Sequence, residues 1–548
     1  MRKILLLAVF CFMASICSAY DFTAVSPSGH TLYYSINGSE VTLTSELEYS
    51  ASSPKTYEAP PVGDLVIPET VTYDGKTYHV TSIGDYAFRC CAGLTALAIP
   101  ESVVSIGNCA IADCENLISV NIPSKVTTLS MGLFLRDVSL TSITIPETVD
   151  SIGSWVFYGC SGLTSVNIPG GVKSLEYAVF SDCTSLTSVT FPKSLTYVGE
   201  FAFNKCTSLL SAILPEGVES IGESAFYECG NLITINIPKN VNSIGAFAFF
   251  NCKSLTSAII PDGVTSIEKS TFSGCSDLAS VTIPEGVTSI GHQAFCGCRS
   301  LTSVTLPESL TTLGGDAFED CLGLTSITIP KNVTSIGFLP FGVCYNLESI
   351  IVEEGNTVYD SRGGCNALIE TATNTLLEGC QNTVIPEGIT TISVGAFFCC
   401  YPLTSITIPE GVTAMYDGAF QYCTSLTSVT IPSTMTYIDI CVFQGCTSLT
   451  DVYCNAQNIP ETKETTFEGV PFASATLHVP ASAIDKYKAT EPWSKFGSIV
   501  PLTTPVGDIL CDEPTAGSQS YYDLLGSHSN QPVQRGIYIR NGKKVVIK

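Results

Sequence analysis

Apolar and polar residues alternate along most of the chain in one pattern that repeats every 23 residues. A typical unit is IPEGVTSIGHQAFCGCRSLTSVT, residues 283–305. Prolines mark the period from Pro100 to Pro330, and the same phase resumes at Pro386, Pro409 and Pro432. Fourteen units in one phase predict a solenoid, in which each unit forms one coil and contacts only the adjacent coils.

The recurring apolar positions indicate which side chains form the core. Leu follows the proline by 17 residues in every unit, from Leu117 to Leu449. Aliphatic residues follow it by three and six residues, as Val287 and Ile290 do. Phe follows it by eleven residues in thirteen of the fourteen units, with Ile111 as the exception. A single coil cannot bury this apolar face, so we expect these side chains to stack in columns through the solenoid.

Each unit predicts two strands and a turn. LTSVTIP alternates apolar and polar residues with period two, which is typical of a strand, and its proline ends the ladder. VTSIG predicts a second short strand, and QAFCGC predicts one helical or 3₁₀ turn before the next Leu. About 15 coils at a strand spacing of about 4.8 Å would span roughly 70 Å.

The pattern LxxVxIPxxVxxIGxxAFxxCxx resembles the BspA-like leucine-rich repeat family of bacterial surface proteins. The resemblance covers roughly residues 65–453. It implies a leucine-rich repeat solenoid of β-rich α/β class that is curved and secreted. It also implies protein-binding or adhesive roles.

The remaining segments divide the chain into further parts. Residues 1–19 have the layout of a signal peptide: Arg2 and Lys3, an apolar stretch, and a small-residue cleavage site before Tyr20. We expect a β cap over residues 20–80, with turns at Asn37-Gly38 and Asp74-Gly75. The solenoid would span 81–453 with an insert at 351–385, followed by a C-terminal cap at 454–500 and a linker at 501–519.

Two of these segments carry more specific expectations. The insert breaks the period, and we expect a hairpin around 359–364 that lies beside the stack, either as a structural digression or as a binding loop. In the C-terminal cap, Ala481 to Ala489 predicts a short helix with Trp493 and Phe496 packed behind it.

The last segment, 520–548, is a β tail that ends in GIYI, one residue, and then NGKKVVIK. This ending is similar to the C-terminal sorting domains read by the type IX (Por) secretion system. Ser527 and His528 stand where that family usually has an Arg-rich pair, so the match is partial. The alternative is a small β module that ends the fold.

Charge and hydropathy exclude several functions. The chain has 50 acidic residues against 25 Lys and Arg, a net charge of −25. Such a chain repels nucleic acid, and it has no basic cluster to offset the repulsion. Beyond the N-terminus, no apolar run approaches the ~18–20 residues of a transmembrane span. We therefore expect an exported protein with an acidic exterior.

The chain has 25 cysteines, and most of them follow the repeat. Cys follows the proline by 14 residues in thirteen of fourteen units, with Asp137 as the exception. Stacking would place these thiols in one ladder with parallel side chains, which favours buried structural thiols over a metal site. Cysteines outside this position are candidates for disulfide pairs in an oxidising compartment, two of them with a ladder cysteine: Cys109 with Cys114, Cys441 with Cys446, and Cys365 with Cys380.

The residues do not indicate catalysis. The five histidines are scattered, and no HExxH, GxSxG or phosphate-binding loop is found. We expect no enzyme activity, no cofactor and no metal. Carboxylates recur at the turn after the proline and predict an exposed acidic row, with a weak cation or basic-partner site as the alternative: Glu101, Glu147, Glu216, Asp262, Glu285, Glu308, Glu387 and Glu410.

The outward positions of the first strand are mostly Thr and Ser, which is typical of a water-facing strand and offers a hydroxyl surface for glycan or protein contact. Leu210, Ile213, Ile233 and Ile259 interrupt this pattern in three successive coils. Adjacent exposed apolar residues often mark a contact site, so we predict a partner-binding patch here.

The expected function is surface binding or adhesion to an extracellular protein or glycan. A structural surface component or a glycan-processing enzyme is the alternative, and the oligomeric state is left open.

Overall fold

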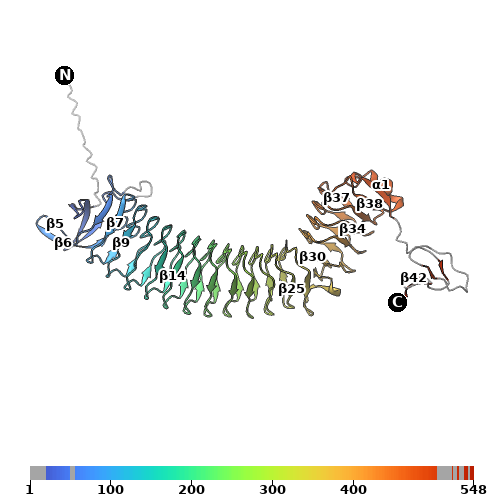
Figure 1. Cartoon of the computed structure of the whole chain (residues 1–548), viewed down its shortest axis with the longest axis horizontal. Coiled ribbons are helices and arrows are strands. Elements are labelled where there is room, and N and C mark those ends of the chain that lie inside the picture. Colours follow the sequence, from blue (N-terminus) through green and yellow to red (C-terminus); the bar gives the residue numbers. More distant parts are fainter. Residues whose placement is uncertain are drawn as a thin grey trace, which may run out of the picture.

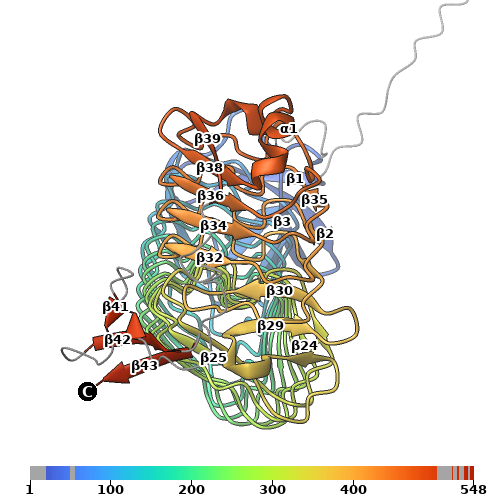
Figure 2. The same cartoon turned by 90° about the vertical axis from the view of Figure 1, so that its right-hand side faces the viewer.

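The computed structural model describes residues 20–49 and 56–502, together with strands at 521–522, 528–529, 536–540 and 543–547. The chain forms a curved rod of stacked coils, whose direction changes near β30 (Thr375–Gly379) (Figure 1). Viewed from the C-terminal end, the coils lie behind one another and share one outline (Figure 2). The predicted solenoid is thereby confirmed.

The first predicted strand forms in most units, and these strands pair in parallel as a ladder along one side of the rod. Residues 301–307 form no strand, and Ser142 makes only an isolated bridge to Ser165. Paired residues in neighbouring repeats lie one period apart, as Val166 and Val189 do. The pairing between strands is interrupted in places along this side. Its strands are β4 (Gly63–Val66), β7 (Leu94–Ala98), β9 (Ser119–Val120), β12 (Ser165–Asn167), β14 (Ser188–Thr190), β16 (Ser211–Ile213), β18 (Thr234–Asn236), β20 (Ser257–Ile259), β22 (Ser280–Thr282), β25 (Ser326–Ile329), β27 (Ser349–Val352), β32 (Ser405–Thr407), β34 (Ser428–Ile431), β36 (Asp451–Cys454), β38 (Thr476–Val479) and β39 (Ser498–Pro501).

The second predicted strand forms a parallel ladder on another side of the coil, mostly from two-residue strands, of which Ser-Ile is the commonest. Most of its isoleucines point inward and are buried, while its serines lie at the surface. Its strands are β6 (Lys76–Ile83), β8 (Ser105–Ile106), β10 (Thr128–Leu129), β11 (Ser151–Ile152), β13 (Ser174–Leu175), β15 (Tyr197–Val198), β17 (Ser220–Ile221), β19 (Ser243–Ile244), β21 (Ser266–Ile267), β23 (Ser289–Ile290), β24 (Thr312–Leu313), β26 (Ser335–Ile336), β30, β31 (Thr391–Ile392), β33 (Ala414–Met415), β35 (Tyr437–Ile438) and β37 (Glu461–Thr462).

The third side of each coil is not the helical turn that the sequence predicts. In all fourteen units, the residues nine and thirteen positions after the proline have positive φ, for example Phe201 (56°) and Lys205 (57°). Helix requires successive right-handed residues, so these two positions interrupt it. Their N–H groups instead donate to the next coil, Phe201 to Glu223 O at 2.9 Å and Lys205 to Tyr227 O at 2.7 Å. This segment, which we call the turn edge, therefore adds a third set of bonds between coils.

The core confirms the predicted columns. Phenylalanine rings of successive coils stack in parallel, as Phe157 and Phe180 do with ring centroids 5.3 Å apart and an interplanar angle of 4°. The column runs without a break from Phe134 to Phe341 and resumes at Phe397. The buried side chains accordingly form two clusters that meet at the insert. The expected count of about 15 coils is not fixed by this structure, because β6, β30 and β38 continue the stack outside the 23-residue unit.

The cysteine ladder is a hydrogen-bonded one. The Cys206 thiol donates to Phe180 O of the preceding coil at 3.1 Å, and the same contact recurs along most of the ladder. Burial raises the pKa of the Cys206 thiol well above its usual value, so it stays protonated and able to donate. All cysteines of the described residues are free thiols. The three candidate disulfides, Cys109–Cys114, Cys441–Cys446 and Cys365–Cys380, are therefore not formed in this structure.

At the N-terminal end, a sheet in the order β1-β2-β3-β6-β5 covers the first coil, and β8 joins it through β6. The added strands are β1 (Phe22–Val25), β2 (Thr31–Asn37), β3 (Glu40–Thr44) and β5 (Thr70–Tyr73). Asp74 and Gly75, both with positive φ, join β5 to β6. These strands pair with one side of the stack and so close it.

At the C-terminal end, a 3₁₀ turn at Ala481–Ala483 leads into the helix α1 (Ile484–Lys488), and a second 3₁₀ turn covers Trp493–Lys495. Trp493 is fully buried and packs edge-on against Phe467, the last ring of the column, with centroids 5.0 Å apart. Phe496 contacts the same ring. These aromatic side chains end the apolar column and exclude water from it.

Beyond residue 502, four strands form an antiparallel sheet in the order β41-β40-β42-β43: β40 (Tyr521–Tyr522), β41 (His528–Ser529), β42 (Gly536–Arg540) and β43 (Lys543–Ile547). The expected signal peptide at 1–19 lies outside the described residues, as does most of the expected linker. In the part of the chain that the structure describes, no helix has the length and apolar character needed to cross a bilayer.

The insert lies within the stack and not beside it. Its strands β28 (Tyr359–Asp360), β29 (Ala367–Glu370) and β30 form an antiparallel meander, with a 3₁₀ turn at Arg362–Gly364, and β30 then pairs in parallel with β31. The meander thus takes the place of coils in the second ladder. This antiparallel segment coincides with the change in direction of the rod (Figure 1).

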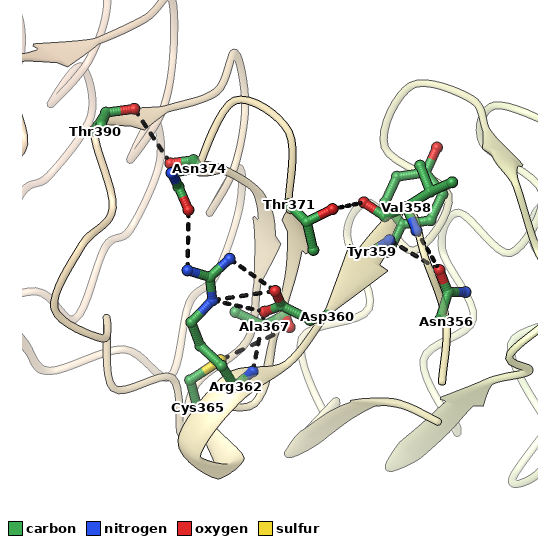
Figure 3. Close-up of polar contacts among 10 residues, drawn as sticks. All are labelled: Asn356, Val358, Tyr359, Asp360, Arg362, Cys365, Ala367, Thr371, Asn374 and Thr390. Atoms are coloured by element: carbon green, nitrogen blue, oxygen red, sulfur yellow. Dashed lines mark hydrogen bonds and ion pairs between the residues drawn. The ribbon is translucent and has the colours of Figure 1, made fainter. Parts of the chain in front are cut away.

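Polar contacts tie the insert to the coils on both sides of it, and Figure 3 shows those within the insert and the contact to Thr390. Arg362 binds Asp360 at 2.7 Å and donates to the Asn374 side chain at 2.9 Å, and Asn374 O accepts from Thr390 N–H of the following coil. On the other side, the Asn356 amide donates to Val333 O of the preceding coil at 3.0 Å. These contacts favour the structural interpretation of the insert over a free binding loop.

Candidate functional site

The four residues of the predicted patch are all exposed. The exposed fractions are 49% for Leu210, 75% for Ile213, 46% for Ile233 and 69% for Ile259. Leu210 and Ile233 occupy the same position in adjacent coils and are joined by a backbone hydrogen bond from Ile233 N–H to Leu210 O at 3.0 Å. Their side chains are thus about one strand spacing, ~4.8 Å, apart.

The other two members lie two coils apart. Ile213 pairs with Asn236 of the intervening coil, and Ile259 occupies the same position one coil further on. Asn236 uses its side chain to bind both backbone groups of Leu214, at 2.7 and 2.8 Å. The structure therefore brings Leu210 and Ile233 together and separates Ile213 from Ile259 by a polar side chain.

The usual residue at the positions of Leu210 and Ile233 is Thr, and it has a structural task. Thr187 Oγ1 donates to Thr164 O of the preceding coil at 3.0 Å, and Thr427 donates to Thr404 O at 2.9 Å. The Thr hydroxyl protons are already donated to the preceding coil. The Thr face therefore presents mainly hydrogen-bond acceptors to a ligand, and few donors. Leu210 and Ile233 give up this bond and expose apolar surface in its place.

The carboxylates of the acidic row are all exposed, as predicted, but several of them bridge coils. Glu410 accepts hydrogen bonds from Ser433 N–H and Oγ, at 3.0 and 2.8 Å, and Glu101 binds Ser124 in the same way. The Ser433 contacts lower the pKa of Glu410, although partial burial opposes them. These carboxylates therefore help to hold neighbouring coils together through hydrogen bonds.

A groove at the turn edge is a second candidate site, which the repeat pattern did not predict. It has a volume of about 390 Å³ and is lined by residues of successive coils from Leu135 to Lys205. Trp155 and Tyr177 meet edge-on with ring centroids 5.6 Å apart, and Tyr177 and Phe201 lie 5.4 Å apart. Trp155 is 38% exposed and Tyr177 41% exposed. The three rings form a continuous aromatic wall along three coils.

Polar side chains complete the groove. Asn204 donates to the hydroxyl of buried Ser181 at 2.8 Å, and Ser181 donates to Asp182 at 3.4 Å. Tyr158 lies beside Asp182, and burial together with this carboxylate raises the pKa of Tyr158. Two cations, Arg136 and Lys205, line the same groove.

A sequence signal for this groove exists. The left-handed position nine residues after the proline holds small or polar residues in most units, whereas Trp155 and Phe201 stand there in the groove. Tyr177 precedes that position by one residue. The period places these side chains together, but only the left-handed backbone shows that they face the solvent and not the core.

Asp137 occupies a cysteine position in the ladder and is fully buried. Its Oδ1 accepts from Cys114 N–H at 2.8 Å, while Oδ2 has no hydrogen-bond partner. Burial raises its pKa well above the usual value. Within residues 20–49 and 56–502, no group of three or more His, Cys, Asp or Glu is placed to hold a metal ion.

Comparisons with known proteins find leucine-rich repeat proteins among the similar structures. Among solved structures, a leucine-rich repeat protein from Bacteroides ovatus is 28% identical, with 61% of this chain and 95% of that chain covered and a TM-score of 0.42. A leucine-rich cell surface protein from Faecalibacterium prausnitzii is 23% identical, with 89% and 96% covered and a TM-score of 0.37. No protein among curated sequences matches the chain.

The repeat also matches a family model. The model for the BspA type leucine rich repeat region matches residues 76–187, 152–279, 265–365 and 374–488, which together make up more than half of the chain. The repeat period, the stacked coils and this match agree, and the chain belongs to the BspA-type leucine-rich repeat family.

Proposed function

We propose that the protein is secreted or displayed at a bacterial cell surface, where it binds or adheres to protein or glycan ligands without catalysis. The observation that carries this proposal is the exposure of Leu210, Ile213, Ile233 and Ile259 in three successive coils, on a face that elsewhere presents mostly Thr, Ser and Asn. Exposed apolar side chains in adjacent coils of a water-facing sheet indicate a contact site.

The location in this proposal is supported by the two ends of the sequence. The signal-like residues 1–19 would direct export, and the segment 520–548 would serve as a type IX sorting domain. The proposal keeps the expected parts of the chain: a β cap at 20–80, the solenoid at 81–453, a C-terminal cap at 454–500 and a linker at 501–519. Export that stops when residues 520–548 are deleted would support this assignment of the C-terminal segment.

A structural surface component without a specific ligand is the main alternative. A glycan-processing enzyme is less favoured, because hydrolysis of a glycosidic bond generally uses two carboxyl groups and the turn-edge groove is lined by one, Asp182. A binding measurement separates the first two functions.

The experiment measures binding of the purified protein to a panel of immobilised extracellular matrix proteins by biolayer interferometry. The variant carries L210T, I213T, I233T and I259T, which install the residue found at these positions in other coils. We expect at least tenfold weaker binding with an unchanged melting temperature, because Thr restores the hydroxyl contact between coils.

The matched control is I118T, which makes the same change at the same repeat position in a distant coil, where Ile118 is 57% exposed. Loss of binding in I118T and the patch variant alike would indicate a nonspecific surface effect. Failure of every matrix protein to bind would favour the structural component, and equal binding by the patch variant and the unmodified protein would eliminate the patch.

A further inference from the structure

We propose that the turn-edge groove between the coils of Trp155 and Lys205 binds a saccharide that carries a carboxylate, such as a uronate or a sialate. This inference deepens the proposed binding function by naming a ligand class. It concerns a different surface, because the patch lies on the first ladder of strands and the groove lies on the turn edge.

The aromatic wall provides an apolar surface of the kind that sugar rings need. Trp155, Tyr177 and Phe201 hold their rings in contact along three coils, and two of them are more than a third exposed. Sugar rings have apolar C–H faces that pack on aromatic rings, and such rings lose little side-chain entropy on binding because they have only two χ angles. The backbone under them is held by hydrogen bonds to the next coil, for example from Trp155 N–H to Tyr177 O at 2.9 Å.

The floor of the groove provides hydrogen-bonding groups that are already ordered. Ser181 is 1% exposed and bridges Asn204 and Asp182. The Asn204 amide oxygen and the Asp182 carboxylate can accept from sugar hydroxyl groups. A few convergent polar groups beside an apolar wall, in a volume of about 390 Å³, are typical of sites for small ligands.

The charge of the groove points to an acidic sugar. Lys205 forms no ion pair with any described residue, and Arg136 lies 3.7 Å from Asp113, whose carboxylate is also bound by Arg89 at 3.0 Å. The groove thus holds two cations and one carboxylate in a chain of net charge −25. Lys205 is free to bind a sugar carboxylate, and this contact distinguishes an acidic saccharide from a neutral one.

The test titrates the full protein with tetragalacturonic acid, a hyaluronan tetrasaccharide and sialyllactose, and with the neutral maltotetraose and lactose, by isothermal titration calorimetry. We expect at least one acidic saccharide to bind and the neutral ones to bind at least tenfold more weakly. W155A/Y177A should abolish binding, and K205Q should weaken the binding of the acidic saccharide at least fivefold. The control Y416A removes another edge aromatic, 40% exposed, in a distant coil and should bind normally.

Three outcomes would overturn the inference: no saccharide binds, neutral and acidic saccharides bind equally, or W155A/Y177A binds like the unmodified protein. Circular dichroism and the melting temperature establish that each variant is folded. Failure here is distinguishable from failure of the proposed function, because the matrix-protein measurement reports on the patch and W155A/Y177A leaves the patch intact.

Discussion

Glu378 lies between the two phenylalanine columns, where the insert interrupts the core. It is buried in a small cavity lined by Phe341 and Phe397, and its carboxylate accepts from Phe341 N–H at 3.4 Å. Burial raises its pKa to about 8, with a smaller contribution from Asp316. A neutral carboxylic acid is therefore part of the junction at ordinary pH.

This pKa predicts how stability depends on pH. The unfolded chain loses the Glu378 proton near pH 4.5, whereas the folded chain keeps it to about pH 8. The stabilisation by this group is therefore fully present below about pH 4.5 and is lost as the pH rises to 8, at up to about 1.4 kcal/mol per pH unit. Differential scanning calorimetry from pH 5 to 8 should show a falling melting temperature, and E378Q should flatten the slope.

Exposed Glu387 offers the matched control, since E387Q removes one negative charge from the surface without changing the junction. A slope that is the same in E378Q and in the unmodified protein would contradict this prediction. The sequence does not predict the burial of Glu378, because a single acidic residue in an aperiodic segment shows no sign of burial.

At the cysteine positions, the sequence predicts that the thiols are buried, but only the structure shows which group accepts their protons. The 23-residue recurrence of Cys predicts buried thiols, and Cys183 and Cys206 are indeed fully buried. The reason for a thiol there is the carbonyl of Phe in the preceding coil, which accepts its proton. That acceptor comes from another coil, so the sequence of one unit does not show it.

The turn edge is the element on which the sequence prediction is wrong. A helical turn satisfies its N–H groups within the segment, whereas here alternate N–H groups bond to the next coil and the others close short turns within the same coil. Phe201 N–H, for example, reaches Glu223 O, while Asn204 N–H returns to Phe201 O at 3.0 Å. Local propensity for a helix is overruled because bonds between coils are available only in the stack.

The left-handed positions of this element predict a specific cost. Gly297 has a φ of 74°, and a Cβ at this residue would meet only ordinary contacts 3.6 Å away in Gly274. G297A should therefore destabilise the fold by about 1 kcal/mol through backbone strain alone. The melting temperature of the purified variant measures this effect.

Gly230 is the control for that measurement, because it has no positive φ and open space around its Cα. G230A should leave the melting temperature unchanged or raise it slightly, since Ala restricts the unfolded chain. An equal loss in the two variants would show that added volume, and not the left-handed backbone, sets the cost.

For the whole molecule, a stack that is stabilised by contacts between neighbours should tolerate removal of one coil. Deleting residues 261–283 joins Ile260 to Pro284 in the same phase, and the strands on either side keep their register. We expect a folded protein that is shorter by about one strand spacing, ~4.8 Å, and slightly less stable. Small-angle scattering and thermal unfolding measure the two effects.

A deletion of residues 261–271 is the matched control, because it removes about half a unit and puts the apolar positions out of phase. This variant should lose cooperative unfolding, since its core side chains would face water. If both deletions behaved alike, in either direction, the coils would not depend on a shared register.

The bend of the rod is also a property of the whole molecule, and the sequence predicts only its position. Pro330 and Pro386 lie 56 residues apart where two units would take 46, so the sequence locates an irregularity there. That the extra residues form a meander inside the stack, bound to Val333 on one side and Thr390 on the other, depends on contacts between segments distant in sequence. Only the tertiary structure shows that the core divides at this point.

The sequence by itself determined the repeat, its phase, the two strands of most coils, the buried columns and the exposure of Leu210, Ile213, Ile233 and Ile259. These features follow from periodicity, because equivalent positions in a stack must share one environment. The tertiary structure alone decided the conformation of the turn edge, the partners of the thiols and the aromatic groove at Trp155 and Tyr177. Each of these depends on hydrogen bonds or contacts with a neighbouring coil, and no segment of one coil contains both partners.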